Sequence, residues 1–109
     1  MTPEDRFADL VDELVASPGV SPPGSGPARG FGSHALRVHD KIFAMLVRDR
    51  LVLKLPRTRV DVLVAAGEGA RFDANKGRPM KEWLALDPDA TVPWAPLARE
   101  ALTFVDAGR

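Results

Sequence analysis

The sequence of 109 residues predicts an α+β fold, a two-layer arrangement in which helices lie mainly on one face of a five-stranded antiparallel sheet. Two observations predict this fold class. Apolar residues recur at helical spacing near both ends of the chain and over one short central stretch, whereas the runs between them have the alternation and length of strands. The resulting order of elements is α-β-β-β-α-β-β-α.

The first helix is expected to begin after Thr2 and to end near Ser17. Thr2 is a suitable N-cap, and Pro3 is tolerated in the first turn because its missing N–H has no helical partner there. Pro18 and Gly19 then stop the helix. The apolar residues of one face recur at i, i+3, i+4, i+7 and i+8, and they are Phe7, Leu10, Val11, Leu14 and Val15.

Residues 18–33 are dominated by Gly and Pro and are expected to form a long loop rather than a packed element. A phosphate-binding P-loop would need a strand before it, a helix after it and a Gly-Lys-Ser/Thr ending. The segment follows a predicted helix, leads into a predicted strand and lacks the Lys. The sequence therefore argues against a nucleotide-binding loop here.

Three strands are expected next, at residues 34–38, 41–47 and 50–55. His39 and Asp40 fall in a tight turn between the first two, and Arg48-Asp49 is a two-residue connection between the second and the third. The second strand is apolar on both faces, which predicts a central place in the sheet. In the third strand, core residues Leu51, Leu53 and Leu55 alternate with the partly wet Arg50, Val52 and Lys54.

A short second helix is expected after Pro56. Thr58, with Asp61 three residues later, has the spacing of a capping box, and Gly67 is a suitable residue beyond the C-terminus. Its apolar stripe consists of Val60, Leu63 and Val64.

Two more strands, at residues 70–74 and 81–87, and a last helix complete the order. Trp83 and Ala85 should share one face of the second of these strands, and Met80 and Trp83 are expected to dock into the core. The last helix begins close to Pro93 and has apolar residues at helical spacing, namely Trp94, Leu97, Ala98, Ala101, Leu102 and Val105.

Length and composition favour one domain over residues 1–109 that is located in the cytoplasm. The chain has no run of about 18 apolar residues that could span a membrane, and its N-terminus is acidic where a secretory signal would be basic and then apolar. It contains no Cys, which excludes disulfides, thiolate metal sites and cysteine nucleophiles.

The net charge is zero but unevenly distributed along the chain. Residues 28–60 contain eight basic and two acidic side chains, whereas residues 1–27 contain one basic and five acidic. The positive middle segment could form a patch for anions, or it could be neutralised by the flanking helices. Both interpretations stay open.

The segments "KIFAMLVRDRLVLKLP", "VDVLVAAGEGARFDANKGRPMKEWLAL" and "PWAPLAREALTFV" resemble the N-terminal domain of TfoX-type proteins and the related small bacterial MmcQ/YjbR-type proteins. The similarity covers roughly residues 32–105, and "Gly-Arg-Pro-Met-Lys-Glu-Trp" is its most particular part. The resemblance implies a fold of the secretion-chaperone-like sort, with the same order of elements. TfoX-type proteins are linked to the regulation of competence and have a further C-terminal domain, which we expect this chain to lack.

Catalytic and metal-binding residues are not expected. His34 and His39 have a spacing that would place them on opposite faces of a regular strand, so neither is predicted to form a site with Asp40. Asp73 and Glu82 are interpreted as salt-bridge partners for Arg71 or Lys81. The Ser residues lack a nucleophile motif, and the resemblance supplies neither catalytic residues nor a cofactor.

The sequence therefore predicts a non-enzymatic domain that acts by binding, through a protein partner or self-association, in a regulatory role. The helix-free face of the sheet would be the surface for that partner. The alternative is a nucleic-acid-binding module, consistent with the DNA-binding description that often accompanies MmcQ/YjbR-type proteins. Its contacts would come from the central segment and the 75–81 turn, and the candidate residues are Arg29, Arg37, Lys41, Lys76, Arg78 and Lys81.

Overall fold

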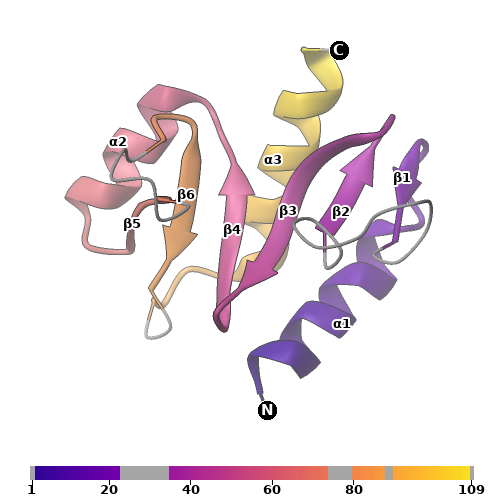
Figure 1. Ribbon diagram of the computed structural model, residues 1–109, viewed down its shortest axis with the longest axis horizontal. Helices are drawn as coiled ribbons and strands as arrows, with labels where there is room; N and C mark the ends of the chain where they lie inside the picture. Colours follow the sequence, from indigo (N-terminus) through magenta and orange to yellow (C-terminus); the bar gives the residue numbers. More distant parts are fainter. Residues whose placement is uncertain (1, 23–34, 74–79, 88–89, 109) are drawn as a thin grey trace.

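Figure 1 shows the computed structural model of the chain, which describes residues 2–22, 35–73, 80–87 and 90–108. Three helices and six strands are present in the described part. In chain order they are α1 (Pro3–Leu14), β1 (Val20–Ser21), β2 (Ala35–Val38), β3 (Lys41–Val47), β4 (Arg50–Lys54), α2 (Arg57–Ala65), β5 (Gly69–Arg71), β6 (Trp83–Leu86) and α3 (Trp94–Ala107). The strands form one antiparallel sheet with the order β1-β2-β3-β4-β6-β5. The predicted α+β class is confirmed.

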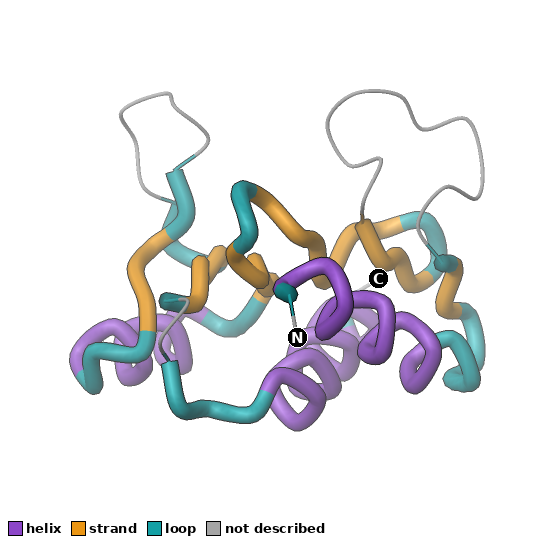
Figure 2. The backbone as a smooth tube through the Cα atoms, turned by 90° about the horizontal axis from the view of Figure 1, so that it is seen from below, coloured by secondary structure: helices purple, strands orange, loops and turns teal. Residues whose placement is uncertain are grey.

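All three helices lie on the same side of the sheet, as Figure 2 shows. The main core fills the space between the sheet and these helices, because alternate strand residues point toward α1 and α3. Leu51, Leu53 and Leu55 are fully buried in it, as their spacing predicts. The helices contribute apolar stripes to the same core, with Phe7, Leu10 and Leu14 from α1 and Leu97, Ala98, Ala101 and Val105 from α3.

A sixth strand lies in the segment that was predicted to be an unpacked loop. In β1, Val20 pairs with Val38 and Ser21 pairs with Arg37, at the edge of the sheet. Gly19 makes this approach feasible, because it has a positive φ of 80° and a Cβ atom there would lie 2.6 Å from the His39 Nε2 atom. The loop prediction is therefore wrong for residues 20 and 21, and its residues 23–33 lie outside the described part.

The helix ends follow two different patterns. Thr2 caps α1, since its Oγ1 accepts a hydrogen bond from the Asp5 backbone N–H and Asp5 accepts one from the Thr2 backbone N–H. The helix ends at Leu14, a turn earlier than predicted. The predicted capping box at Thr58 is wrong: α2 begins at Arg57, so Thr58 is already inside the helix. None of the three helices in the described part of the chain has the length and apolar character of a membrane-spanning helix.

Both predicted hairpin turns are present, and each has two central residues with positive φ. His39 and Asp40 have φ angles of 49° and 68°, and Arg48 and Asp49 have φ angles of 50° and 66°. Two consecutive residues in this region give a turn whose twist matches that of the flanking strands. The turns therefore have the preferred hairpin geometry without the Asn-Gly residues that usually supply it.

Strand β3 contains a bulge that bends it. Leu36 of β2 lies opposite Ala44 and Arg37 lies opposite Ile42, so Phe43 has no partner in β2. Phe43 and Ala44 both face the main core as a result. Pairing of β3 with β4 extends only from Val47 back to Ala44, and Figure 1 shows the N-terminal half of β3 curving away from β4. A bulge commonly produces such a bend.

The centre of the helix-free face is buried. Val52 is fully buried and Met45 is 3% exposed, and both belong to a second, smaller apolar cluster. The other buried members of this cluster are Ala35, Phe72 and Ala85. The expectation that this face is an open surface for a partner is therefore wrong at its centre, and a binding surface has to be sought at its margin.

Candidate anion-binding groove

A groove with a volume of about 600 Å³ opens at the end of the sheet where β3 and β4 diverge. Residues from β2, β3, β4, β6, the β2–β3 turn and the C-terminal end of α3 line it. They are Arg37, Asp40, Lys41, Ile42, Lys54, Trp83, Phe104, Val105 and Gly108. We call this hollow the β3–β4 groove.

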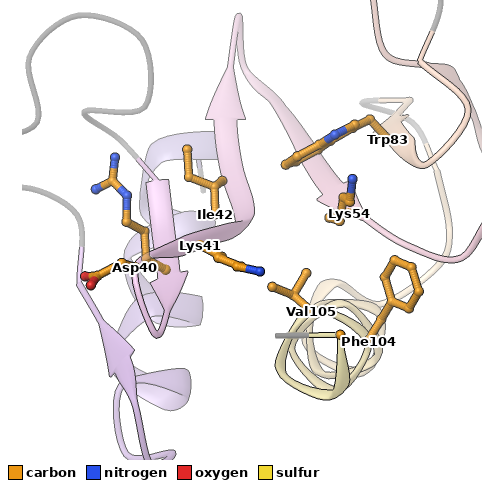
Figure 3. Close-up of a pocket in the computed structure, with 9 residues that line it drawn as sticks. Asp40, Lys41, Ile42, Lys54, Trp83, Phe104 and Val105 are labelled. Carbon is orange, nitrogen blue, oxygen red and sulfur yellow. The ribbon is translucent and has the colours of Figure 1, made fainter.

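The walls of the β3–β4 groove are largely apolar. In Figure 3 the ring of Trp83 lies across from Ile42, and Phe104 and Val105 project from α3 on the adjoining side. Ile42, Trp83 and Phe104 are all partly exposed. The groove thus offers apolar surface to a ligand at a place where the sheet and α3 do not close on each other.

Two lysines bring positive charge to these apolar walls. Figure 3 shows the side chain of Lys41 extending toward Val105, and Lys41 has no ion-pair partner among the described residues. The ammonium of Lys54 lies 3.4 Å from the Glu82 carboxylate and 5.3 Å from the centre of the Trp83 ring. Cations attract anions most strongly where apolar walls reduce access of water.

Sheet register explains why these side chains come together. Lys54 lies directly opposite Trp83 across the β4–β6 pair, and Arg37 lies opposite Ile42 across the β2–β3 pair. Side chains of directly paired residues point to the same face of a sheet. Both pairs therefore lie on the helix-free face, at the end where β3 has left β4.

A second, shallower hollow adjoins the groove and shares Lys54 and Trp83 with it. It has a volume of about 390 Å³ and is lined by Lys54, Arg57, Met80, Lys81, Glu82 and Trp83. Together the two hollows contain five cations, Arg37, Lys41, Lys54, Arg57 and Lys81, and two acids, Asp40 and Glu82. We call this region the cationic end of the sheet.

Negative charge also approaches the groove, from α3. The helix ends at Ala107 with Gly108 as its C-cap, and Gly108 lines the groove. The C-terminal end of a helix carries the negative pole of its dipole. The nearby Asp106 carboxylate lies 3.4 Å from the imidazole of His39 in the β2–β3 turn.

The structure brings together three of the six residues that were predicted to contact an anion. Arg37 and Lys41 line the β3–β4 groove, and Lys81 lines the adjoining hollow. The other three, Arg29, Lys76 and Arg78, lie outside the described residues. Sequence reasoning missed Lys54 and Arg57. The alternation of Lys54 with Leu53 and Leu55 was a usable signal, because it placed Lys54 on the face opposite the core.

Several predicted side-chain roles need correction. Glu82 pairs with Lys54 rather than with Arg71 or Lys81, and Arg71 pairs with Asp61 of α2. Met80 is 40% exposed, so it is not docked in the core. The register of the β4–β6 pair explains the first correction, because it places Lys54 opposite Trp83, the residue next to Glu82.

The positive middle segment is partly neutralised by a flanking helix. Arg59 of α2 forms a two-bond ion pair with Glu100 of α3, at 2.9 and 3.2 Å. Both interpretations of the segment therefore describe part of it: Arg59 is neutralised locally, whereas the cationic end keeps an excess of positive charge.

Among the described residues, no group of three or more His, Asp or Glu side chains is arranged to hold a metal ion. The same part of the chain has no buried side-chain nitrogen or oxygen atom without a hydrogen-bond partner.

Comparison of the chain with protein-family models finds no match. Searches of curated proteins and of solved structures likewise find no similar protein.

Proposed function

We propose that the chain is a non-enzymatic, TfoX N-terminal-like domain that acts in the cytoplasm by binding a protein partner in a regulatory role, and that the partner presents an acidic segment to the cationic end of the sheet. One observation carries the proposal. In a molecule of zero net charge, five cations and two acids gather around two adjoining hollows. Such an excess attracts an oppositely charged surface and orients it.

Binding is supported over catalysis by the kind of groups that line the hollows. The carboxylates there are Asp40 and Glu82, which belong to different hollows, and Glu82 is paired with Lys54. A general acid–base pair would need two titratable groups that converge on one reacting atom. Cations on apolar walls supply attraction and orientation instead.

A nucleic acid is the second candidate partner, and Trp83 is the observation that favours it. Single-stranded nucleic acids bind to surfaces where aromatic side chains lie among cations. Trp83 is partly exposed and lines both hollows, together with Lys54, Arg57 and Lys81. The ammonium of Lys54 lies over the Trp83 ring, so a base would have to displace it in order to stack there, and we rank this candidate second.

The test compares two charge-reversed variants of the immobilised protein. Lys41→Glu/Lys81→Glu removes cations from the cationic end, whereas Arg48→Glu/Arg50→Glu makes the same change of charge at the opposite end of β3 and β4. Cytoplasmic extract, with and without nuclease treatment, is passed over each, and retained proteins are purified and their binding is measured directly.

We expect to purify a protein that binds the native chain and the Arg48→Glu/Arg50→Glu variant but does not bind the Lys41→Glu/Lys81→Glu variant. Its affinity should fall with added salt, because exposed charges are screened. Retention that disappears with nuclease, accompanied by binding of a labelled single-stranded oligonucleotide, would establish the second candidate instead. Equal retention by the two variants would reject the cationic end as the binding surface.

A further inference from the structure

We propose that the β3–β4 groove binds a small amphipathic carboxylate, with the hydrocarbon part of the ligand on the apolar walls and its carboxylate at Lys41 and Lys54. This inference goes beyond the proposed partner-binding role and does not require it. An acidic protein segment needs only the surface cations, whereas the volume and apolar walls of the groove suit a free small molecule.

The size and lining of the groove fit such a ligand. Pockets for small molecules commonly have volumes of about 300–1,000 Å³ and predominantly apolar walls with a few placed polar groups. The β3–β4 groove has a volume of about 600 Å³, and its apolar side chains are Ile42, Trp83, Phe104 and Val105. They come from β3, β6 and α3, so they surround the space from several directions (Figure 3).

The charges fix the polar end of the ligand. Lys41 extends along the groove toward Val105 in Figure 3 and has no ion-pair partner in the described part of the chain. Lys54 is held over the Trp83 ring and beside Glu82, which places its ammonium at the apolar wall. Both lysines line the groove, so a carboxylate held there would gain a charge-assisted hydrogen bond from Lys41 and attraction from Lys54 while its hydrocarbon chain covers the aromatic surface.

The end of α3 favours a single negative charge over a double one. Gly108 lines the groove at the C-terminal end of this helix, where the dipole is negative. This pole repels a doubly charged phosphate more strongly than a carboxylate. A helix N-terminus would offer backbone N–H donors to a phosphate, but the helix end at this groove is a C-terminus, which presents carbonyl groups instead.

The probe for the test is octanoate, observed through the backbone and indole N–H signals in a heteronuclear NMR spectrum of the native protein. The chain has two Trp residues, and a Trp83→Phe variant assigns the indole signal of Trp83. Octanoate is expected to shift that signal and the amide signals of Lys41 and Ile42 in a saturable manner. Acetate, octanol and octyl phosphate serve as probes that lack the tail, lack the charge or carry a double charge.

Two matched variants separate recognition of the carboxylate from general attraction. Lys41→Met should weaken octanoate binding about tenfold, the effect of losing one charge-assisted hydrogen bond. Arg50→Met removes a cation from the far end of β4 and should leave the affinity unchanged. The same NMR spectra establish that both variants are folded.

Four results would overturn the proposal. They are the absence of saturable shifts with octanoate, equal binding of octanol, tighter binding of octyl phosphate, and equal weakening by Lys41→Met and Arg50→Met. Partner binding is measured in a different assay. The failure of one proposal therefore leaves the result of the other intact.

Discussion

At the scale of single residues, four turn residues have positive φ, and Arg48 is the one whose residue type is not enriched there. His39, Asp40, Arg48 and Asp49 all lie in the left-handed region, where residues other than Gly, Asn, Asp and His are rare. The flanking strands impose this geometry, because a two-residue hairpin turn must match their twist. The turn positions could be predicted from the sequence, whereas the backbone conformation at each position is a consequence of strand pairing.

The β3–β4 turn also brings two acids together. The pKa of Glu4 is lowered, mainly by a hydrogen bond with the backbone and to a lesser extent by one with the Asp49 side chain. The pKa of Asp49 is raised, mainly by the hydrogen bond with Glu4 and to a lesser extent by the negative charge of Glu4. Glu4 belongs to α1 and Asp49 follows β3, so this proximity exists only in the folded chain. At neutral pH the two carboxylates repel each other.

Asp49→Asn should raise the thermal midpoint at neutral pH, because Asn removes this repulsion and tolerates the positive φ. The sign follows from linkage. The raised pKa of Asp49 means that its favourable contribution is present in acid and is lost as the pH rises through that pKa. Glu4 behaves in the opposite way, and its contribution is lost as the pH falls through its lowered pKa. The advantage of Asn should therefore shrink in acid.

Thermal unfolding followed by circular dichroism from acid to neutral pH measures this effect, with Asp9→Asn on the exposed side of α1 as the control. A gain that stays the same at every pH would mean that the backbone conformation alone accounts for it. No gain at neutral pH would contradict the repulsion.

At the scale of elements, helix capping shows how a sequence pattern can be present without its structure. Thr2 and Thr58 are each followed three residues later by Asp, and only Thr2 is an N-cap. Strand β4 ends at Lys54 and Pro56 precedes α2, which lets the helix begin at Arg57. Asp61 is then used across the fold, in its ion pair with Arg71 of β5.

Thr2→Ala should lower the free energy of unfolding by about 1 kcal/mol, because the Asp5 backbone N–H loses the hydrogen bond that it donates to the Thr2 Oγ1 atom. Thr58→Ala should have a much smaller effect, since its side chain does not cap α2. Urea denaturation of the two variants measures the difference. Equal losses would contradict the capping assignment.

The strands themselves could be predicted from alternation, but the bulge could not. Trp83 and Ala85 share one face of β6, with Leu84 and Leu86 on the other, as their spacing predicts. After Lys41 the run 42–47 is apolar throughout, so the sequence does not indicate where its alternation breaks. The break at Phe43 is visible only in the pairing with β2, and it leaves both Phe43 and Ala44 buried in the main core.

At the scale of the whole molecule, protection should decrease from the centre of the sheet to its edges. Strands β3, β4 and β6 each pair on two sides, whereas β1 and β5 are edge strands of two and three residues. Local opening is easiest where few buried contacts and few paired strands hold the backbone.

Native-state hydrogen exchange is therefore expected to be slowest for amides at the centre of β4, such as that of Leu53, and faster for those of β1. The exchange of individual amides can be followed by NMR in deuterated buffer. Exchange of the β1 amides as slow as that of Leu53 would show that the edge opens only with the whole fold and would contradict the expectation.

The α+β class, the approximate positions of the helices and of five of the six strands, and the core faces of most of these elements could be read from the chain alone, because they depend on the local spacing of apolar residues. Met80 and Val52 are exceptions, since the first is exposed and the second is buried against expectation. The sixth strand, the bulge and the groove depend instead on contacts between residues that are far apart in the chain. Val20 becomes a strand residue only when Val38 offers it a partner. Lys41, Lys54 and Phe104 line one groove only because β3 leaves β4 near the end of α3. A binding site built from such distant residues depends on register and packing, which the local pattern does not contain.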